Sequence, residues 1–226
     1  DGKIVQALKS FVEDYDVATW VKESGVWICT KARLEKQLSK HESDWRAITL
    51  GLADYVNKNN FKSVIIGLSG GLDSAAVAAI AVDALGPDRV WCVMMPSIYT
   101  SDDSLGDAQL CISSLGCRYD VVPIKPAIEA YEAMFGTLFK GQENDLTEEN
   151  LQSRARAIVL MGLSNKFGPM VVTTGNKSEM AVGYATLYGD MCGGFNPIKD
   201  IYKSKLFEIC EWRNNNNLDD LLGKKR

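Results

Sequence analysis

The 226-residue chain has one histidine, no closely spaced cysteine pair and no long apolar run. A membrane-spanning helix needs about 20 consecutive apolar residues, and the first ten residues lack a signal-peptide pattern. Six cysteines at irregular spacings, without a C-x-x-C pair, disfavour a zinc or dithiol site and indicate reduced, mostly buried thiols. We therefore expect a cytoplasmic protein that does not bind a membrane.

The shortage of histidine and of positive charge limits the possible functions further. His41 lies in the polar stretch LSKHESD, which we predict to be a linker. A histidine-dependent catalytic triad and a histidine-rich metal site are therefore disfavoured. The formal net charge of −4 disfavours nucleic-acid binding, because a duplex binder needs a basic face. Any anionic ligand must be met by local lysine and arginine residues.

Strand and helix patterns alternate after a first helix that is expected to begin at Asp44. Apolar runs occur at residues 63–67, 88–96, 118–124 and 169–175, and helical patterns at about 74–85, 103–115, 147–166 and 198–212. Thr147 and Asp200 are the predicted caps of the last two helices. Continuous apolar strands separated by helices predict an α/β fold, a parallel sheet with helices on both faces. Ligands of such sheets bind at the carboxyl ends of the strands.

The stretch LSGGLDS follows the first apolar run and opens a helix. Gly70 and Gly71 permit close backbone approach, Ser69 and Ser74 add hydroxyl groups, and the helix start adds free N–H groups, so an anion fits here. No lysine follows the second glycine, which excludes a Walker A loop. Asp73 would repel a phosphate unless a cation lies between them, which makes it a candidate magnesium ligand. The alternative is a simple glycine turn.

Two further stretches carry polar side chains at informative spacings. In ENLQSRARAIVL, Asn150 and Arg154 share one helix face, whereas Gln152 and Arg156 share another. Two ligand-binding faces and two solvated arginines are both compatible with this pattern. A core-facing stripe is expected on the remaining face, formed by Leu151, Ala155, Ile158, Val159 and Leu163.

The second stretch, TTGNKSEMAVGYATLYGDMCGGFNPIKDIYKSK, is rich in glycine and in short polar groups. Such a composition is unsuited to a core and suits a loop that folds over a ligand. Its candidate site residues are Thr174, Glu179, Asp190, Lys199 and Lys203. Glu179 is a candidate second carboxylate on a metal ion held by Asp73.

Together these motifs resemble a known family. SGGLDS is similar to the ATP-pyrophosphatase loop of NAD, GMP, asparagine and argininosuccinate synthetases, and ENLQSRAR, TTGNKSEMAVGYATLYGDMCGGFNPIKD and YKSK resemble NAD synthetase specifically. The resemblance covers about residues 44–213 and implies an adenine nucleotide α-hydrolase-like, Rossmann-like fold. The stretch before the loop resembles the entry to the synthetase domain of the glutamine-dependent, two-domain form.

The resemblance also implies a domain division. Residues 1–40 would be the end of an upstream nitrilase-like glutaminase domain with a linker, and residues 41–226 the synthetase domain. That domain is expected to be incomplete near its end, where NNNNLDDLLGKKR interrupts the pattern. Cys29, Lys31 and Glu35 contain the residue types of an amidase triad, but they lie at the end of that domain rather than its centre, so this interpretation is rejected.

The implied reaction is the ATP-dependent amidation of deamido-NAD (nicotinic acid adenine dinucleotide) to NAD, the last step of NAD biosynthesis. The nicotinate carboxylate attacks the α-phosphate of ATP and releases pyrophosphate, and ammonia then displaces AMP from the acyl adenylate. Ammonia would come from glutamine in the full-length enzyme or be used directly. Family members are homodimers with deamido-NAD bound across the subunit interface, so at least a homodimer is expected.

The resemblance assigns roles to individual positions. The residues implied in ATP binding are Ser69, Gly70, Gly71, Asp73, Ser74, Arg156, Thr174, Glu179 and Lys203. Those implied in deamido-NAD binding are Asn150, Arg154, Asp190 and Lys199. Asp73 and Glu179 would share Mg²⁺, while Asp73, Asp190 and Lys203 would be catalytic, with Asp190 near the incoming ammonia.

Two other hypotheses use the same loop. One is an ATP-pyrophosphatase with another acceptor, either a nucleotide or a tRNA, and the acidic net charge disfavours the tRNA. The other is a sensor that binds ATP without turnover. Asp73 and Glu179 disfavour the sensor, because simple retention of ATP does not need two metal ligands.

Overall fold

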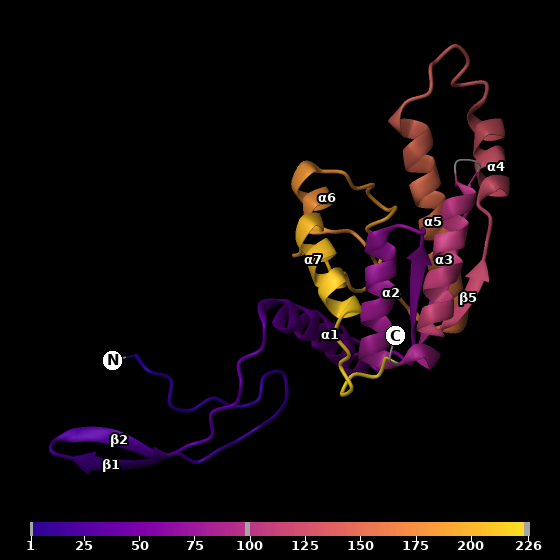
Figure 1. Cartoon of the computed structure of the whole chain (residues 1–226). Helices are drawn as coiled ribbons and strands as arrows, with labels where there is room; N and C mark the ends of the chain where they lie inside the picture. The colour runs from indigo at the N-terminus through magenta and orange to yellow at the C-terminus, as the bar shows by residue number, and fades with distance from the viewer. Residues whose placement is uncertain (1, 98–99, 224–226) are drawn as a thin grey trace.

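The computed structural model describes residues 2–97 and 100–223 and has a four-stranded parallel sheet at its centre (Figure 1). The sheet order is β5-β4-β3-β6, formed by Arg118–Val121, Val90–Met94, Val64–Leu68 and Met170–Val172. Neighbouring strands pair in parallel throughout. The predicted α/β fold is confirmed. The start of the predicted range 1–40 (residue 1) and the end of the predicted range 41–226 (residues 224–226) lie outside the described residues.

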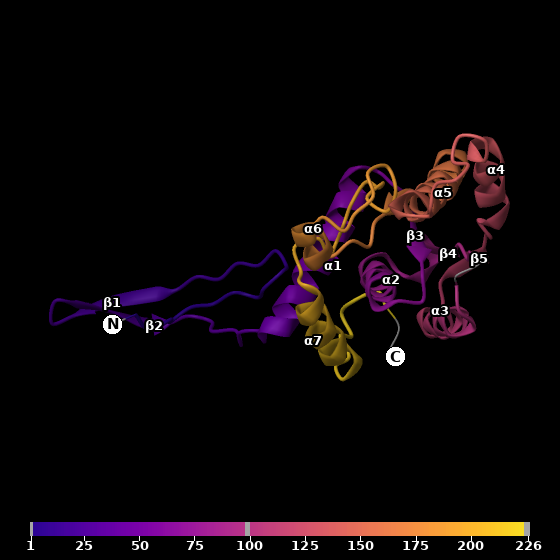
Figure 2. The same cartoon turned by 90° about the horizontal axis from the view of Figure 1, so that it is seen from above.

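Helices cover both faces of this sheet, as Figure 2 shows from above. The helices are α1 (Lys40–Lys58), α2 (Leu72–Leu85), α3 (Asp102–Leu115), α4 (Lys125–Phe135), α5 (Leu146–Phe167), α6 (Lys177–Val182) and α7 (Lys203–Asn214), with the 3-10 turn η1 (Pro87–Arg89) before β4. Side chains alternate along a strand, so Val64 and Ile66 join the core under α1, α2, α3 and α7, whereas Ile65 joins the core under α4 and α5. Both faces are therefore buried, as expected for a parallel sheet.

The N-terminal residues form an arm that extends away from the sheet (Figure 1). Its two strands, β1 (Thr19–Glu23) and β2 (Val26–Lys31), pair as an antiparallel hairpin. The prediction of a linker at His41 is wrong, because Ser39 caps α1 by accepting a hydrogen bond from the Glu42 N–H at 3.2 Å. The helix therefore begins at Lys40, ahead of the expected Asp44, and His41 lies in its first turn.

Both predicted helix caps are also wrong. Asp145 caps α5 by accepting from the Thr147 N–H at 2.7 Å, so Thr147 lies inside the helix. The helix expected at Asp200 begins three residues later, because Ile201 closes a turn on Ile198 and accepts a hydrogen bond from the Lys177 N–H. The expected core stripe on α5 fails at Ile158, which is 62% exposed.

No helix in residues 2–97 and 100–223 combines the length and apolarity that crossing a membrane requires.

Candidate active site

The loop between β3 and α2 is closely packed against the start of α3. Gly70 has a φ of +82°, and a Cβ at this position would overlap the backbone of Ser104, with its Cα only 2.9 Å away. Both the backbone angle and the space therefore require glycine. Gly71 caps α2 without a side-chain hydrogen bond, so the first N–H groups of the helix face the loop with no capping side chain. These features suit an anion.

Two serines hold this loop closed. The buried Ser74 hydroxyl accepts from the Ser69 N–H at 3.1 Å and donates to the Gly71 carbonyl at 3.0 Å. The two hydroxyl oxygens lie 3.0 Å apart, and the Ser69 hydroxyl accepts from the Gly71 N–H at 3.2 Å. The loop shape is thus fixed by its own side chains.

Asp73 stands in the first turn of α2 and contacts two other elements. Its Oδ1 accepts from the Asn176 side-chain amide at 3.1 Å, and its Oδ2 accepts from the Lys203 ammonium at 2.9 Å. The Asp73 hydrogen bond raises the pKa of Lys203, burial opposes the rise, and the charges of Asp73 and Glu179 add to it. Lys203 therefore stays protonated and supplies a cation beside the loop.

Sequence reasoning missed Asn176, although this residue links the two predicted metal ligands. Asn176 is fully buried and caps α6 by accepting from the Glu179 N–H at 3.1 Å. Glu179 in turn accepts from the Asn176 N–H at 2.8 Å, which completes a capping box. The spacing Asn-x-x-Glu in GNKSE is the signal that predicts this motif and the short helix α6.

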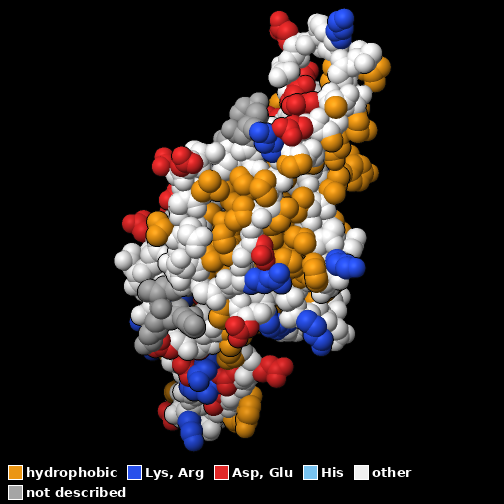
Figure 3. Space-filling model, turned by 90° about the vertical axis from the view of Figure 1, so that its right-hand side faces the viewer, with side chains coloured by type: hydrophobic (Ala, Val, Ile, Leu, Met, Phe, Trp, Pro, Cys, Tyr) orange, Lys and Arg blue, Asp and Glu red, His pale blue; other side chains and the backbone are white. Residues whose placement is uncertain are grey.

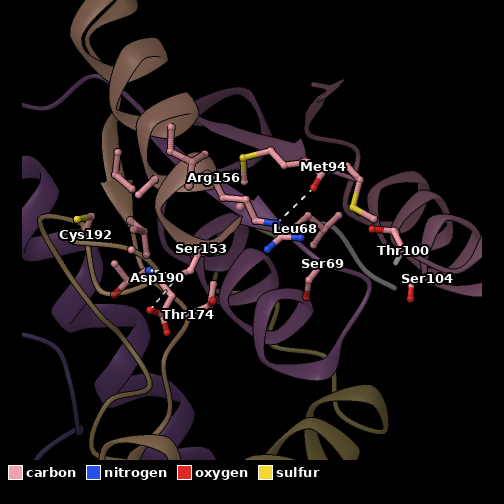
Figure 4. Close-up of a pocket in the computed structure, with 18 residues that line it drawn as sticks. Leu68, Ser69, Met94, Thr100, Ser104, Ser153, Arg156, Thr174, Asp190 and Cys192 are labelled. Carbon is pink, nitrogen blue, oxygen red and sulfur yellow. Dashed lines mark hydrogen bonds between the residues drawn. The ribbon is translucent and has the colours of Figure 1, made fainter. Parts of the chain in front are cut away.

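A cavity of about 440 Å³ opens at the carboxyl ends of β3, β4 and β6. The predicted residues Ser69, Arg156, Thr174 and Asp190 all line it. Figure 4 shows Arg156 reaching from α5 into the middle of this group, with Asp190 on one side and Ser69 on the other. The Arg156 Nε donates to the Met95 carbonyl at 3.4 Å, and burial lowers the pKa of its guanidinium.

The segment after α6 folds back onto the polar side of α5. Asn150 accepts from the Thr186 hydroxyl at 2.8 Å, and Arg154 donates to the Leu187 carbonyl at 3.1 Å. Ser153, which sequence reasoning also missed, accepts from the Asp190 N–H at 3.0 Å and donates to the Asp190 carboxylate at 3.3 Å (Figure 4). The face predicted to bind a ligand thus also holds the segment that carries Asp190.

Lys199 is separated from the other predicted substrate residues. It lines a second cavity of about 610 Å³ together with Lys177, Phe195 and Asn196, and Thr173 borders both cavities. Apart from Lys199, the predicted residues thus form three neighbouring groups. These are the anion loop with the first cavity, the pair Asp73 and Lys203 with Asn176 and Glu179, and the segment held by α5.

Comparisons with known proteins agree with this architecture. A family model described as NAD synthase matches residues 44–222. A glutamine-dependent NAD(+) synthetase of Xanthomonas campestris is 55% identical over 221 residues, which cover 95% of this chain and 39% of that protein. A related protein from Xylella fastidiosa is 49% identical over 213 residues, again covering 39% of its length. The chain thus spans about two fifths of these curated relatives.

Solved structures show the same similarity. A glutamine-dependent NAD+ synthetase from Acinetobacter baumannii, in complex with ADP, superposes with a TM-score of 0.81 at 43% identity, covering 88% of this chain and 37% of that one. An NH3-dependent NAD synthetase from Campylobacter jejuni superposes with a TM-score of 0.70 at 28% identity, covering 78% and 75%.

Proposed function

The chain belongs to the NAD synthase family, and on this premise we propose that it catalyses the ATP-dependent amidation of deamido-NAD to NAD. The observation that carries the proposal is the anion loop beside a cavity that contains Arg156, Thr174 and Asp190. In the first step the nicotinate carboxylate attacks the α-phosphorus of ATP, and the bond to pyrophosphate breaks. In the second step ammonia attacks the acyl carbon, AMP leaves with the bonding electrons, and one proton is released.

ATP is proposed to bind with its phosphates on the loop and the start of α2. A helix end contributes only about 0.3–1 kcal/mol per charge, whereas micromolar affinity requires about 8 kcal/mol. Cationic side chains must therefore supply much of the remainder, and Lys203 and Arg156 are the candidates. Ser69 and Thr174 add hydroxyl donors, while Gly70, Gly71 and Ser74 shape the loop.

The donor atoms around Asp73 and Glu179 fit a magnesium ion. Mg²⁺ prefers carboxylate oxygens and usually keeps waters and substrate phosphates as its other ligands. Within the residues that the structure describes, no cluster of three or more His, Cys, Asp or Glu side chains could hold a metal. In the proposal, Asp73 and Glu179 would hold the ion together with phosphate oxygens of ATP, and the Lys203 ammonium lies at Asp73 Oδ2. A bound Mg²⁺ would neutralise phosphate charge.

Catalysis in this proposal is mostly positioning and neutralisation of charge. Lys203 would stabilise the negative charge that gathers on the phosphates as pyrophosphate departs. Asp190, held by Ser153, would accept a hydrogen bond from ammonia and orient its attack. Deamido-NAD would contact Asn150 and Arg154 near the cavity, and Lys199 in the neighbouring one.

The proposed partners are ATP, deamido-NAD, ammonia or glutamine, and a second copy of the chain. Hydrophobic side chains gather on the face formed by β5, α4 and α5 (Figure 3), and exposed ones on these elements include Val121, Met134, Ile158 and Phe167. Burial of such a face in a homodimer would remove it from water. The glutamine-dependent relatives are longer than this chain, so ammonia is the nitrogen source to test first.

The test is pyrophosphate release from ATP and Mg²⁺ by this chain and by a full-length protein that contains it. Deamido-NAD should stimulate release, and NAD should appear only when ammonia or glutamine is added. A different nucleotide that carries a carboxylate, added in place of deamido-NAD, tests the alternative that the enzyme acts on another acceptor. Absence of stimulation by deamido-NAD in the full-length protein would refute the proposal.

Substitution of the proposed metal ligand gives a second arm of this test. Asp73→Asn should lower the rate of adenylation by about 100-fold, the usual loss when one charge-stabilising group is removed. Binding of ATP measured by calorimetry should also lose its dependence on Mg²⁺. Adenylation at the parent rate in Asp73→Asn would contradict the role given to this carboxylate.

A further inference from the structure

Helices α2 and α7 lie side by side and run in the same direction (Figures 1 and 2). Both begin at the candidate active site, since Asp73 stands in the first turn of α2 and Lys203 is the first residue of α7. The Lys203 Nζ lies 2.9 Å from the Asp73 Oδ2. The Lys203 side chain is 48% exposed, and its backbone N–H donates to the Ser178 hydroxyl of α6 at 3.0 Å. The position of its ammonium at Asp73 therefore depends on where α7 lies along α2 as well as on this contact.

The far ends of the same two helices are joined by a buried ion pair. Asp83 is 1% exposed and Arg213 is 6% exposed. The guanidinium approaches both carboxylate oxygens, with Nε at 2.9 Å from Oδ2 and Nη2 at 3.3 Å from Oδ1. Trp45 of α1 donates its indole N–H to the same Oδ2 at 2.9 Å, and Arg213 also donates to the Asn216 carbonyl. The pair is thus held from α1 as well.

The two ion pairs are spaced equally on the two helices. Ten residues separate Asp73 from Asp83, and ten separate Lys203 from Arg213, which corresponds to about 15 Å along each helix. Parallel helices with equal spacing satisfy both pairs at one register only. A slip of one residue would move α7 by about 1.5 Å and turn it by about 100°.

We propose that Asp83 and Arg213 are positioning residues that fix the register of α7 along α2 and so hold Lys203 at Asp73. Apolar packing alone tolerates small slides and rotations, whereas a two-pronged guanidinium–carboxylate contact defines both distance and angle. A buried ion pair is also weak evidence for stability in itself, since apolar replacements often fold as well. Its specific contribution here is geometric. The catalytic consequence of the register rests on the proposed function, whereas the register itself does not.

The test uses a variant that keeps the volume of the buried cluster and removes its directional contacts. Asp83→Leu, Arg213→Met and Trp45→Phe are combined, so that neither the carboxylate nor the guanidinium is left buried without its partner. Asp73→Asn removes the ion pair with Lys203 directly and provides the highest expected labelling rate of Lys203, with which the other variants are compared. Leu115→Ala, at the buried end of α3, is the control for a general loss of stability. Arg213→Lys retains the charge but not the two-pronged contact.

The main readout is acylation of the Lys203 amine, followed by peptide mass spectrometry and normalised to the exposed Lys166. The amine must leave its 2.9 Å contact with Asp73 Oδ2 before it can react, so that contact slows acylation. We expect the triple variant to label Lys203 several-fold faster than the parent and to approach Asp73→Asn, with Arg213→Lys between them and Leu115→Ala at the parent rate. Labelling at the parent rate in a folded triple variant overturns the proposal.

Pyrophosphate release separates this inference from the proposed function. If Lys203 acts on the departing pyrophosphate, the triple variant should lower kcat while leaving the KM for ATP nearly unchanged. Faster labelling with an unchanged kcat would support the role of Asp83 and Arg213 in fixing the register of α7, but would show that this register does not matter for catalysis. A full-length protein whose pyrophosphate release is not stimulated by deamido-NAD would refute the proposed function, and the labelling result would still decide the register.

Discussion

Asn176 uses both ends of its side-chain amide at a fully buried position. The oxygen accepts from the Glu179 N–H and the nitrogen donates to Asp73, so one residue caps α6 and orients a carboxylate of the candidate site. Asn176→Ala should lower the free energy of unfolding by about 1–3 kcal/mol, because a cap is lost and buried groups lose their partners. Urea denaturation measures this loss.

Asn176→Ser is the matched control, because serine also caps helices but cannot reach Asp73 with an amide. We expect it to recover most of the stability that alanine loses and to release pyrophosphate as slowly as the alanine variant. Serine with the activity of the parent would show that the contact to Asp73 does not matter.

At the scale of elements, the contribution of α7 to the free energy of unfolding should fall at alkaline pH. Burial, together with the charge of Asp73, raises the pKa of Cys210 on α7 to about 11, and the Asp73 contact raises the pKa of Lys203. A group whose folded pKa is raised stabilises the fold below its unfolded pKa and loses that contribution as pH rises through the folded value. For Cys210 the window runs from about 9 to about 11.

Denaturation midpoints measured across this window should therefore fall, and Cys210→Ala should fall less steeply than the parent. The difference in unfolding free energy is expected to reach at most about 2 kcal/mol. Cys29→Ala, in the hairpin, is the control and should follow the parent. Equal slopes for Cys210→Ala and the parent would contradict the assignment.

The elements also show what the sequence can and cannot predict. The parallel sheet was predictable because β3 and β4 are unbroken apolar runs, and such strands must be covered on both faces. The starts of α5 and α7 were not predictable: polar residues compete to cap α5, whereas α7 has no side-chain cap and starts after a turn that Ile201 closes on Ile198. Asp145, rather than Thr147, caps α5 because it forms a capping box with Glu148, and only the folded backbone determines which of the two residues takes the cap position.

The candidate active site was likewise predictable from the sequence only in part. The loop from Ser69 to Ser74 is local and was readable from its glycines, serines and acid. The contacts of Asp73 with Asn176 and Lys203 join residues 103 and 130 positions apart, and no local pattern encodes such distances. The resemblance to a family supplied roles for residues, but not the hydrogen bonds that hold them.

At the scale of the whole molecule, the N-terminal arm behaves as a separate body in space (Figure 2). It approaches α1 mainly through Phe11 and Val12, which line a small cavity with Thr49 and Leu50. Trypsin should cleave the arm at its exposed lysines outside helices and strands, Lys36 among them, while the sheet domain remains intact. The trimmed domain should lose less than about 1 kcal/mol, or about 2–4 °C in Tm.

Mass spectrometry of the digest and a thermal melt of the trimmed domain check this expectation. Lys58, at the end of α1, is the internal control and should resist cleavage, because its backbone is helical. Early cleavage within α1, or loss of a cooperative melt after trimming, would show that the arm supports the domain.

Because the two ion pairs are ten residues apart on both α2 and α7, the number of residues between Lys203 and Arg213 cannot change without breaking one of the pairs. One alanine inserted after Phe207 would rotate Arg213 by about 100° relative to Lys203, so that only one of the two ion pairs forms. Inserting four residues nearly restores the angle but displaces the guanidinium by about 6 Å along the axis. Related chains should therefore vary freely in the exposed side chains between residues 203 and 213, yet insertions and deletions should be absent from that interval.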